Sequence, residues 1–232
     1  MVIASTVTPG AAEVLDGLLG RRHSCRGFLP TPVVRDVQRE ILAAAQRTAS
    51  WCNSQPWQVH IAEGEAKQRL GVLLADPIQP GETGSDLSWP SDYLGVYKER
   101  RRVCGMALYD SVGVAHGDRV ASALQAQENF RFFGAPHVAI ITSDAALGVY
   151  GAVDCGAYIA NFLLAATSRG VATVAQAALA SRSARLRDFF GLDARRKVVC
   201  GISFGYADPA HPANAFRTGR ADVDAAAAWI SQ

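Results

Sequence analysis

The segment 153–168 constrains the fold most, because it is apolar on almost every side of a helix. Such a helix must be covered all round, by the rest of the chain or by a partner across a two-fold interface. Its nearly uncharged part, 155–168, is too short to span a bilayer and contains Tyr158 and Asn161. We therefore expect a central buried helix with other layers packed around it.

Strands are few and do not alternate regularly with helices. Short β-rich runs bounded by turn residues occupy 58–62, 137–142 and 197–205, and 171–175 is a further candidate. Long helices around a few core strands predict an α+β domain in three layers rather than a doubly wound sheet. The other expected helices are 13–22, 92–114, 117–133, 183–190 and one that starts with Thr31 as N-cap and Pro32 at its first position.

Length and charge narrow the class of protein. The 232 residues fit a single domain, 1–232, with one loop-like excursion around 76–105. The net charge of +2 gives no global attraction to nucleic acid or to an anionic membrane. The five cysteines are scattered without a C-x-x-C pair, and the N-terminus lacks a signal-peptide pattern. We expect a cytoplasmic protein with no metal site, no nucleic-acid partner and no membrane partner.

Residues 201–205 match the G-x-S-x-G pattern of serine hydrolases. That pattern requires a helix after the serine, whereas the following residues, 206–209, are typical of a strand that ends in a turn. We interpret 201–205 as a core strand with small residues where something packs closely, and a serine hydrolase stays a remote alternative. The basic run 98–102 is interpreted as the solvated face of a helix.

Three separated segments concentrate side chains that bind ligands. Segment 21–28 holds three arginines, a histidine and a serine, which suit an anion such as phosphate. Segment 50–57 places two tryptophans beside Asn, Ser and Gln, a combination that suits a planar heteroaromatic ligand. Segment 214–220 adds two more arginines. Taken singly, the three segments also fit a basic surface turn, a capped loop over core tryptophans and a tail.

Together these segments resemble the nitroreductase family, whose members bind FMN at the interface of a homodimer. The motifs R-R-H-S-x-R-x-F, S-W-C-N-S-Q-P-W, N-F-R-F-F-G-A-P, V-A-Q-A-A-L-A, F-G-Y-A-D-P and R-T-G-R occur in family order over nearly the whole chain. The second motif and a Y-K-E-R-R stretch are most similar to members that act on nitrobenzoate-type aromatics. The resemblance implies a three-layer fold with a central, mostly antiparallel sheet flanked by helices, and a homodimer.

The resemblance also implies a cofactor role for both ends of the chain. Arg22 and Ser24 would hold the FMN phosphate and ribityl chain, with His23 beside them. Arg26 would lie near N1 and the C2 carbonyl of the flavin, where a cation stabilises the reduced ring. Arg220 would close on the phosphate.

Further FMN-binding positions are implied in the middle of the chain and in the other subunit. Ser50, Trp51 and Asn53 would come from the partner of the dimer, while Asn129 and Arg131 would approach the pyrimidine edge of the flavin. The segment expected to pass the N5 side with its backbone donors consists of Ala175, Gln176, Ala177 and Ala178.

The activity that the resemblance implies is the reduction of a nitroaromatic or related electron-poor substrate with NADH or NADPH. It would proceed by ping-pong hydride transfer through bound FMN. No catalytic side chain is predicted, because the flavin carries the chemistry and water can supply protons. The alternatives are a reductive dehalogenase or a flavin-modifying enzyme of the same family, and a flavin-binding protein that is not an enzyme.

Overall fold

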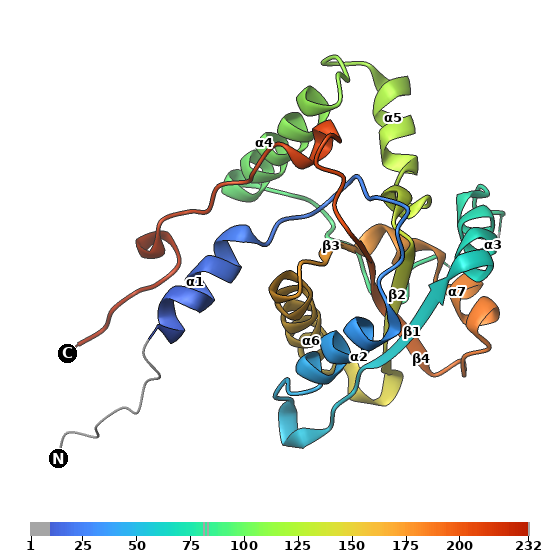
Figure 1. The fold of residues 1–232 in the computed structure, drawn as a ribbon, viewed down its shortest axis with the longest axis horizontal. Coiled ribbons are helices and arrows are strands. Elements are labelled where there is room, and N and C mark those ends of the chain that lie inside the picture. The colour runs from blue at the N-terminus through green and yellow to red at the C-terminus, as the bar shows by residue number, and fades with distance from the viewer. Residues whose placement is uncertain (1–9, 81, 83, 232) are drawn as a thin grey trace.

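A computed structural model describes residues 10–80, 82 and 84–231 (Figure 1). The helices are α1 (Ala11–Arg21), α2 (Arg35–Ala45), α3 (Gly64–Ala75), α4 (Gly95–Ser111), α5 (Arg119–Gln127), α6 (Gly148–Ser168) and α7 (Ser183–Phe190). The strands are β1 (Gln58–Glu63), β2 (His137–Asp144), β3 (Ala172–Gln176) and β4 (Arg196–Gly205). The strands lie close to the four predicted segments, including 171–175.

The strands form one antiparallel sheet in the order β1-β2-β4-β3. Side chains of β2 alternate between the two faces of this sheet, as a strand requires. Val138 and Ile140 pack with α3 and α7, and Ala139 and Ile141 pack with α2 and α6. Figure 1 shows these two helix pairs on opposite sides of the strands. The expected three-layer α+β fold with an antiparallel sheet is confirmed.

Helix α6 packs its inner face on the sheet and leaves its outer face uncovered within one chain. Tyr158 and Phe162 are each 1% exposed. On the other side Val149, Tyr150 and Val153 are 70%, 56% and 60% exposed. Of the two ways of covering this helix that the sequence allows, the chain itself therefore covers only the inner face. The outer face is an apolar surface of the kind that a partner covers.

By length and composition, the stretch Ala145–Ser168 would be long and apolar enough to cross a membrane; it is the one such stretch in the described part of the chain. In this fold it packs against α2, α1, β2 and β3. Core helices of water-soluble proteins have the same composition, and the inner face of α6 is buried in this way.

Helix α2 starts later than its sequence signals predict. The expected start at 31–32 is wrong, because the helix begins at Arg35 with Val34 as its N-cap. The backbone N–H of Val33 donates to Nε2 of the buried His137 at 2.9 Å. This hydrogen bond fixes the segment before α2 to the start of β2. A tertiary contact therefore overrides the helix-start signal of Thr31 and Pro32.

Helix α3 was not predicted from the sequence. Only Leu70 and Leu74 are buried along it, and Val72 is 70% exposed, so its apolar pattern is weak. Gly71 weakens the helical signal further. A side chain there would approach the Phe132 ring to 3.3 Å, so close packing explains the glycine. The helix expected at 92–114 is a few residues shorter at each end. The helix expected at 117–133 ends already at Gln127, so its predicted end is wrong: the chain continues in turns, and Phe132 and Phe133 have positive φ, which an α-helix does not allow.

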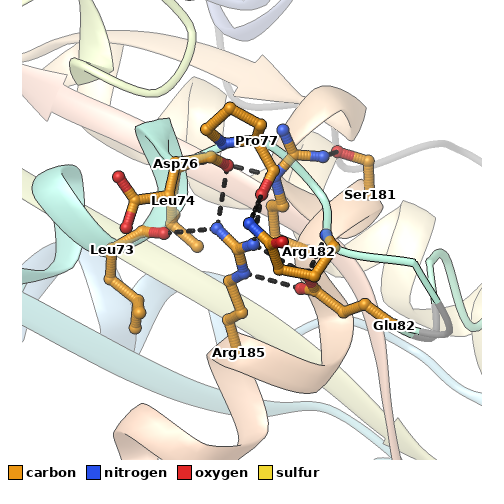
Figure 2. Close-up of polar contacts among 9 residues, drawn as sticks. Leu73, Leu74, Asp76, Pro77, Glu82, Ser181, Arg182 and Arg185 are labelled. Atoms are coloured by element: carbon orange, nitrogen blue, oxygen red, sulfur yellow. Dashed lines mark hydrogen bonds and ion pairs between the residues drawn. The ribbon is translucent and has the colours of Figure 1, made fainter.

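The first part of the predicted excursion is tied to α7. Arg185 of that helix donates to the backbone carbonyls of Leu73, Asp76 and Pro77 and pairs with Glu82 at 2.6 Å (Figure 2). A guanidinium group offers five N–H donors, and this arginine uses them to close the end of α3.

Asp86 anchors the same excursion to the sheet. Its side chain is 3% exposed, pairs with Arg187 of α7 and accepts a hydrogen bond from Val198 N of β4 at 2.8 Å. The later part of the excursion is different, because it leads into α4, which has no buried residue and extends away from the sheet together with α5 (Figure 1).

Candidate cofactor-binding site

A cavity of about 310 Å³ brings the first and third ligand-type segments together. Arg22, Ser24 and Arg26 reach it from the loop after α1, and Arg217 and Arg220 reach it from the C-terminal segment. None of the described residues that line this cavity is acidic. Four guanidinium groups without a carboxylate favour an anion, and guanidinium groups match the geometry of phosphate. We name it the arginine cavity.

Arg217 and Arg220 donate to nearby backbone carbonyls and keep other N–H donors available for a ligand. Nη1 of Arg217 donates to Asn214 O at 2.7 Å, and Nη1 of Arg220 donates to Gly219 O at 2.9 Å. Both side chains belong to exposed residues, and each keeps further N–H groups for a ligand. Arg217 was not among the predicted site residues. Its place in the same segment as Arg220 was the signal that could have identified it.

Arg26 lies between the arginine cavity and a second cavity of about 380 Å³ lined by Phe133 and His211. Its Cζ is 6.0 Å from the centre of the Phe133 ring. Burial lowers the pKa of Arg26, and no described carboxylate acts on it to oppose this effect. Glu128 also lines the second cavity, but it pairs with Arg131. A half-buried cation whose charge no carboxylate offsets is favourable for a negatively charged group of a ligand.

Asn214 clamps the loop after α1 to the C-terminal segment. Its Oδ1 accepts a hydrogen bond from Arg26 N at 2.8 Å, and its Nδ2 donates to Gly27 O at 2.8 Å and to Asp208 O at 2.9 Å. Gly27 also packs closely, since a Cβ there would lie 2.1 Å from Cγ of His211. One side chain therefore fixes the two walls of the arginine cavity relative to each other.

Replacing Asn214 with alanine should weaken the binding of FMN about tenfold, because Arg26 and the C-terminal arginines lose their common anchor and the loop backbone loses two partners. Titration of the apoprotein with FMN, followed by quenching of flavin fluorescence, measures this change. Gln38→Ala is the matched control, because Gln38 is a buried amide that also holds backbone, at Val33 O, outside the cavity. Unchanged FMN affinity in Asn214→Ala would contradict the clamp.

Of the predicted site residues in the middle of the chain, Asn129 and Gln176 meet at the end of β3, whereas Arg131 does not take part in this contact. Nε2 of Gln176 donates to the backbone O of Asn129 at 2.9 Å and to its Oδ1 at 3.2 Å. Ala175 and Ala177 on either side of Gln176 are exposed. Arg131 is a solvent-facing residue with its side chain 69% exposed, and it pairs with Glu128 at 2.7 Å.

Strand β3 also carries the loop of the arginine cavity. Cys25 N donates to Thr173 O at 2.9 Å, and Ser24 forms an isolated parallel bridge with Thr173. From Thr173 to Gln176 a strand rises by about 10 Å. The arginine cavity and the segment 175–178 therefore lie along one strand, at a separation that one extended ligand can cover.

The tryptophan segment lies on the outer face of α6. Trp51 N is 3.2 Å from the carboxylate of Asp154, and its ring packs edge-on against Tyr150 with centroids 4.4 Å apart. Ser50 Oγ accepts a hydrogen bond from Gln55 N at 2.9 Å. Left-handed backbone at residues other than glycine is strained and is concentrated at functional sites. The residues of this segment with positive φ are Cys52, Asn53 and Gln55.

The tryptophan segment is separated from the arginine cavity along the length of α6. Trp51 contacts Asp154, near the start of the helix. A cavity shared by Arg22 and Thr167 places the loop after α1 near the helix end. The rise between residues 154 and 167 of an α-helix is about 20 Å. In Figure 1 the light-blue segment between α2 and β1 lies well away from the blue loop at the end of α1. One chain does not bring both groups to one cavity.

A larger cavity of about 560 Å³ lies between the starts of α2 and α3. Glu63, which lines it, is paired with Arg35 and lies 3.1 Å from Nδ1 of His137. Its acidic and basic side chains thus largely neutralise one another. It contains none of the predicted site residues.

Comparison with known proteins identifies the family of this chain. The model of the nitroreductase family matches residues 19–206. The chain is 35% identical over 205 residues to a 4-nitrobenzoate reductase of Pseudomonas putida, covering 88% of this chain and 90% of that protein. It is 34% identical over 221 residues to a 4-nitrobenzoate reductase of Nocardioides sp. (strain LMS-CY), covering 92% and 89%.

A solved structure gives the same result for the fold. The FMN-dependent nitroreductase NfnB from Mycobacterium smegmatis, in complex with NADPH, superimposes with a TM-score of 0.89 at 31% identity. The match covers 95% of this chain and 99% of that chain. The resemblance drawn from six short motifs is confirmed over nearly the full length. This chain belongs to the nitroreductase family.

Proposed function

We propose that this protein is an FMN-dependent oxidoreductase that uses NADH or NADPH to reduce nitroaromatic or related electron-poor substrates. The observation that carries the proposal is the arginine cavity, in which arginines from both ends of the chain converge without an acidic neighbour. The relatives named as 4-nitrobenzoate reductases support the reaction. The NfnB structure with NADPH supports the choice of reductant.

The donor set of the arginine cavity fits the phosphate of FMN. Arg22, Ser24, Arg217 and Arg220 would hold that phosphate, and Arg26 would lie toward the ring. Bound FMN supplies the capacity to accept a hydride from a reduced nicotinamide and to pass it to a substrate. The side chains of this protein bind and orient the cofactor, and we assign no catalytic acid or base.

We also propose that the active form is a homodimer. The exposed apolar face of α6 supports this, because a partner subunit would bury Tyr150 and Val153. The separation of about 20 Å between Trp51 and the loop after α1 supports it as well. A two-fold axis would bring the tryptophan segment of one subunit to the cavity of the other. Ser50, Trp51 and Asn53 would then complete the site from the partner, and we place the dimer in the cytoplasm.

Purified protein should be yellow and should carry one FMN per chain. It should oxidise NADH or NADPH when 4-nitrobenzoate or nitrobenzene is added, and this is followed by absorbance at the nicotinamide band. Flavin without turnover on either substrate would favour the flavin-binding protein that is not an enzyme. Turnover that needs a halogenated aromatic or flavin itself would favour the other enzyme classes of the family. Protein that binds no flavin would contradict the proposal.

A further inference from the structure

The G-x-S-x-G sequence of β4 has a structural explanation for its glycines. A Cβ on Gly201 would lie 2.4 Å from Cδ1 of Leu179, and a Cβ on Gly205 would lie 2.5 Å from Cδ of Pro136. Neighbouring side chains therefore fill the space next to both positions. This confirms the interpretation of a core strand against which other residues pack. The glycines do not explain the serine between them.

Ser203 is a fully buried hydroxyl that points to the candidate site. Its exposure is 0%, and its Oγ is hydrogen-bonded to Oε1 of Gln176 on the neighbouring strand β3. Gln176 is itself only 2% exposed. The far end of this amide reaches Asn129, which is half-buried. A continuous chain of polar contacts thus runs from the core to the surface.

The direction of every hydrogen bond in this chain is determined. The backbone O of Asn129 can only accept, so Nε2 of Gln176 must face it and donate. Oε1 of Gln176 then faces Ser203, and an amide oxygen can only accept, so the hydroxyl must donate. Nδ2 of Asn129 donates to Ala126 O at 3.0 Å, which leaves its Oδ1 toward Gln176. Each amide has one allowed orientation.

We propose that Ser203 is a positioning residue of the flavin site. Through the amide of Gln176 it holds Asn129 against the segment 175–178, so that two parts of the chain remote in sequence form one edge of the site. This inference rests on the proposed function, because it assumes that this edge receives the flavin ring. Ser203 acts through Gln176 and does not itself touch the ligand.

Removal of the hydroxyl should loosen this edge. In Ser203→Ala the buried Oε1 of Gln176 loses its donor. An unpaired buried acceptor costs free energy, so the amide is driven to rotate or to leave its pocket. Either movement breaks the contacts of Nε2 with Asn129. The arginine cavity lies at the other end of β3 and keeps its residues. The ring of the flavin should therefore be held less firmly, while its phosphate is held as before.

The experiment compares the binding of FMN and of riboflavin to apoprotein. In Ser203→Ala we expect both dissociation constants to rise by about 5- to 20-fold, with their ratio unchanged. The visible absorption band of the bound flavin should also shift, because hydrogen bonding at the ring edge changes. Ser203→Thr keeps the hydroxyl and should restore the wild-type affinity for both ligands.

Ser183→Ala is the matched control, because Ser183 is also 0% exposed and its hydroxyl donates to Ala180 O at 2.7 Å, outside the site. Both alanine variants should lower the melting temperature, and only Ser203→Ala should change flavin binding. If Ser203→Ala does not fold, Gln176→Met is the second variant. It removes the amide through which Ser203 acts, and it should also raise both dissociation constants.

Wild-type flavin affinity and spectrum in Ser203→Ala would overturn the inference and would reduce Ser203 to a structural residue. A rise for FMN alone would overturn it too, because that pattern belongs to the phosphate. Neither result touches the proposed function, which wild-type protein tests by its bound FMN and its nitroaromatic turnover.

Discussion

Val153→Asp should turn the protein into a monomer that does not retain FMN. Val153 is 60% exposed on the outer face of α6, so a single chain accommodates aspartate there at little cost to its own stability. In the proposed dimer the same carboxylate would be buried without a partner, at a cost of about 3 kcal/mol or more. Two-fold symmetry applies this cost twice, so dimer affinity should fall by about 10⁴-fold.

Light scattering coupled to size-exclusion chromatography measures the mass, and flavin absorbance across the same peak measures the cofactor. Val72→Asp is the matched control, because Val72 is 70% exposed on α3, a helix on the other side of the sheet. That variant should stay dimeric and yellow. A Val153→Asp dimer with one FMN per chain would show that the outer face of α6 is not the interface.

The parts of the fold that could be predicted have a strong local cause. Strand β2 was predicted because its residues are apolar and β-branched and are buried on both faces of the sheet. Helix α3 was missed because a half-exposed helix with Gly71 at a close contact has a weak pattern. The start of α2 was misplaced because the decisive partner of Val33 is His137, far away in sequence.

The same distinction applies to the candidate site. Arg22, Ser24 and Arg26 lie in one short motif, so the sequence displays them together. The structure places them around one cavity with Arg220 and with Arg217, which had not been predicted. Asn214 carries no such signal, because its role depends on a hydrogen bond to Arg26 N across 188 positions of the chain.

Ser203 shows the opposite difficulty, because it stands in a motif that points to other chemistry. The pattern around it matches a hydrolase, and only its burial and its bond to Gln176 give it a different role. Short patterns report which residue types are present. The partners of those residues come from the pairing of β3 with β4, which a single sequence does not display.

Replacing Arg220 with alanine should weaken the binding of FMN by about 10- to 150-fold and leave the affinity for riboflavin unchanged. A hydrogen bond to a charged group contributes about 1.5–3 kcal/mol, and only FMN carries the phosphate. Arg217 lines the same cavity, so Arg217→Ala should have an effect of the same kind. In the double variant the affinity for FMN should fall by about 100-fold or more, because two donors are removed from one anion.

The measurement is a titration of apoprotein with each ligand at low ionic strength, repeated at high salt. Arg195→Ala is the matched control: it removes the same charge, its side chain is 73% exposed, and its partner is Asp193. It should change neither affinity, which separates a specific contact from the net charge of the protein. Screening by salt should narrow the difference between wild type and Arg220→Ala for FMN, because the lost interaction is between charges. Equal weakening of FMN and riboflavin would mean that Arg220 does not contact the phosphate and that the arginine cavity holds another part of the ligand.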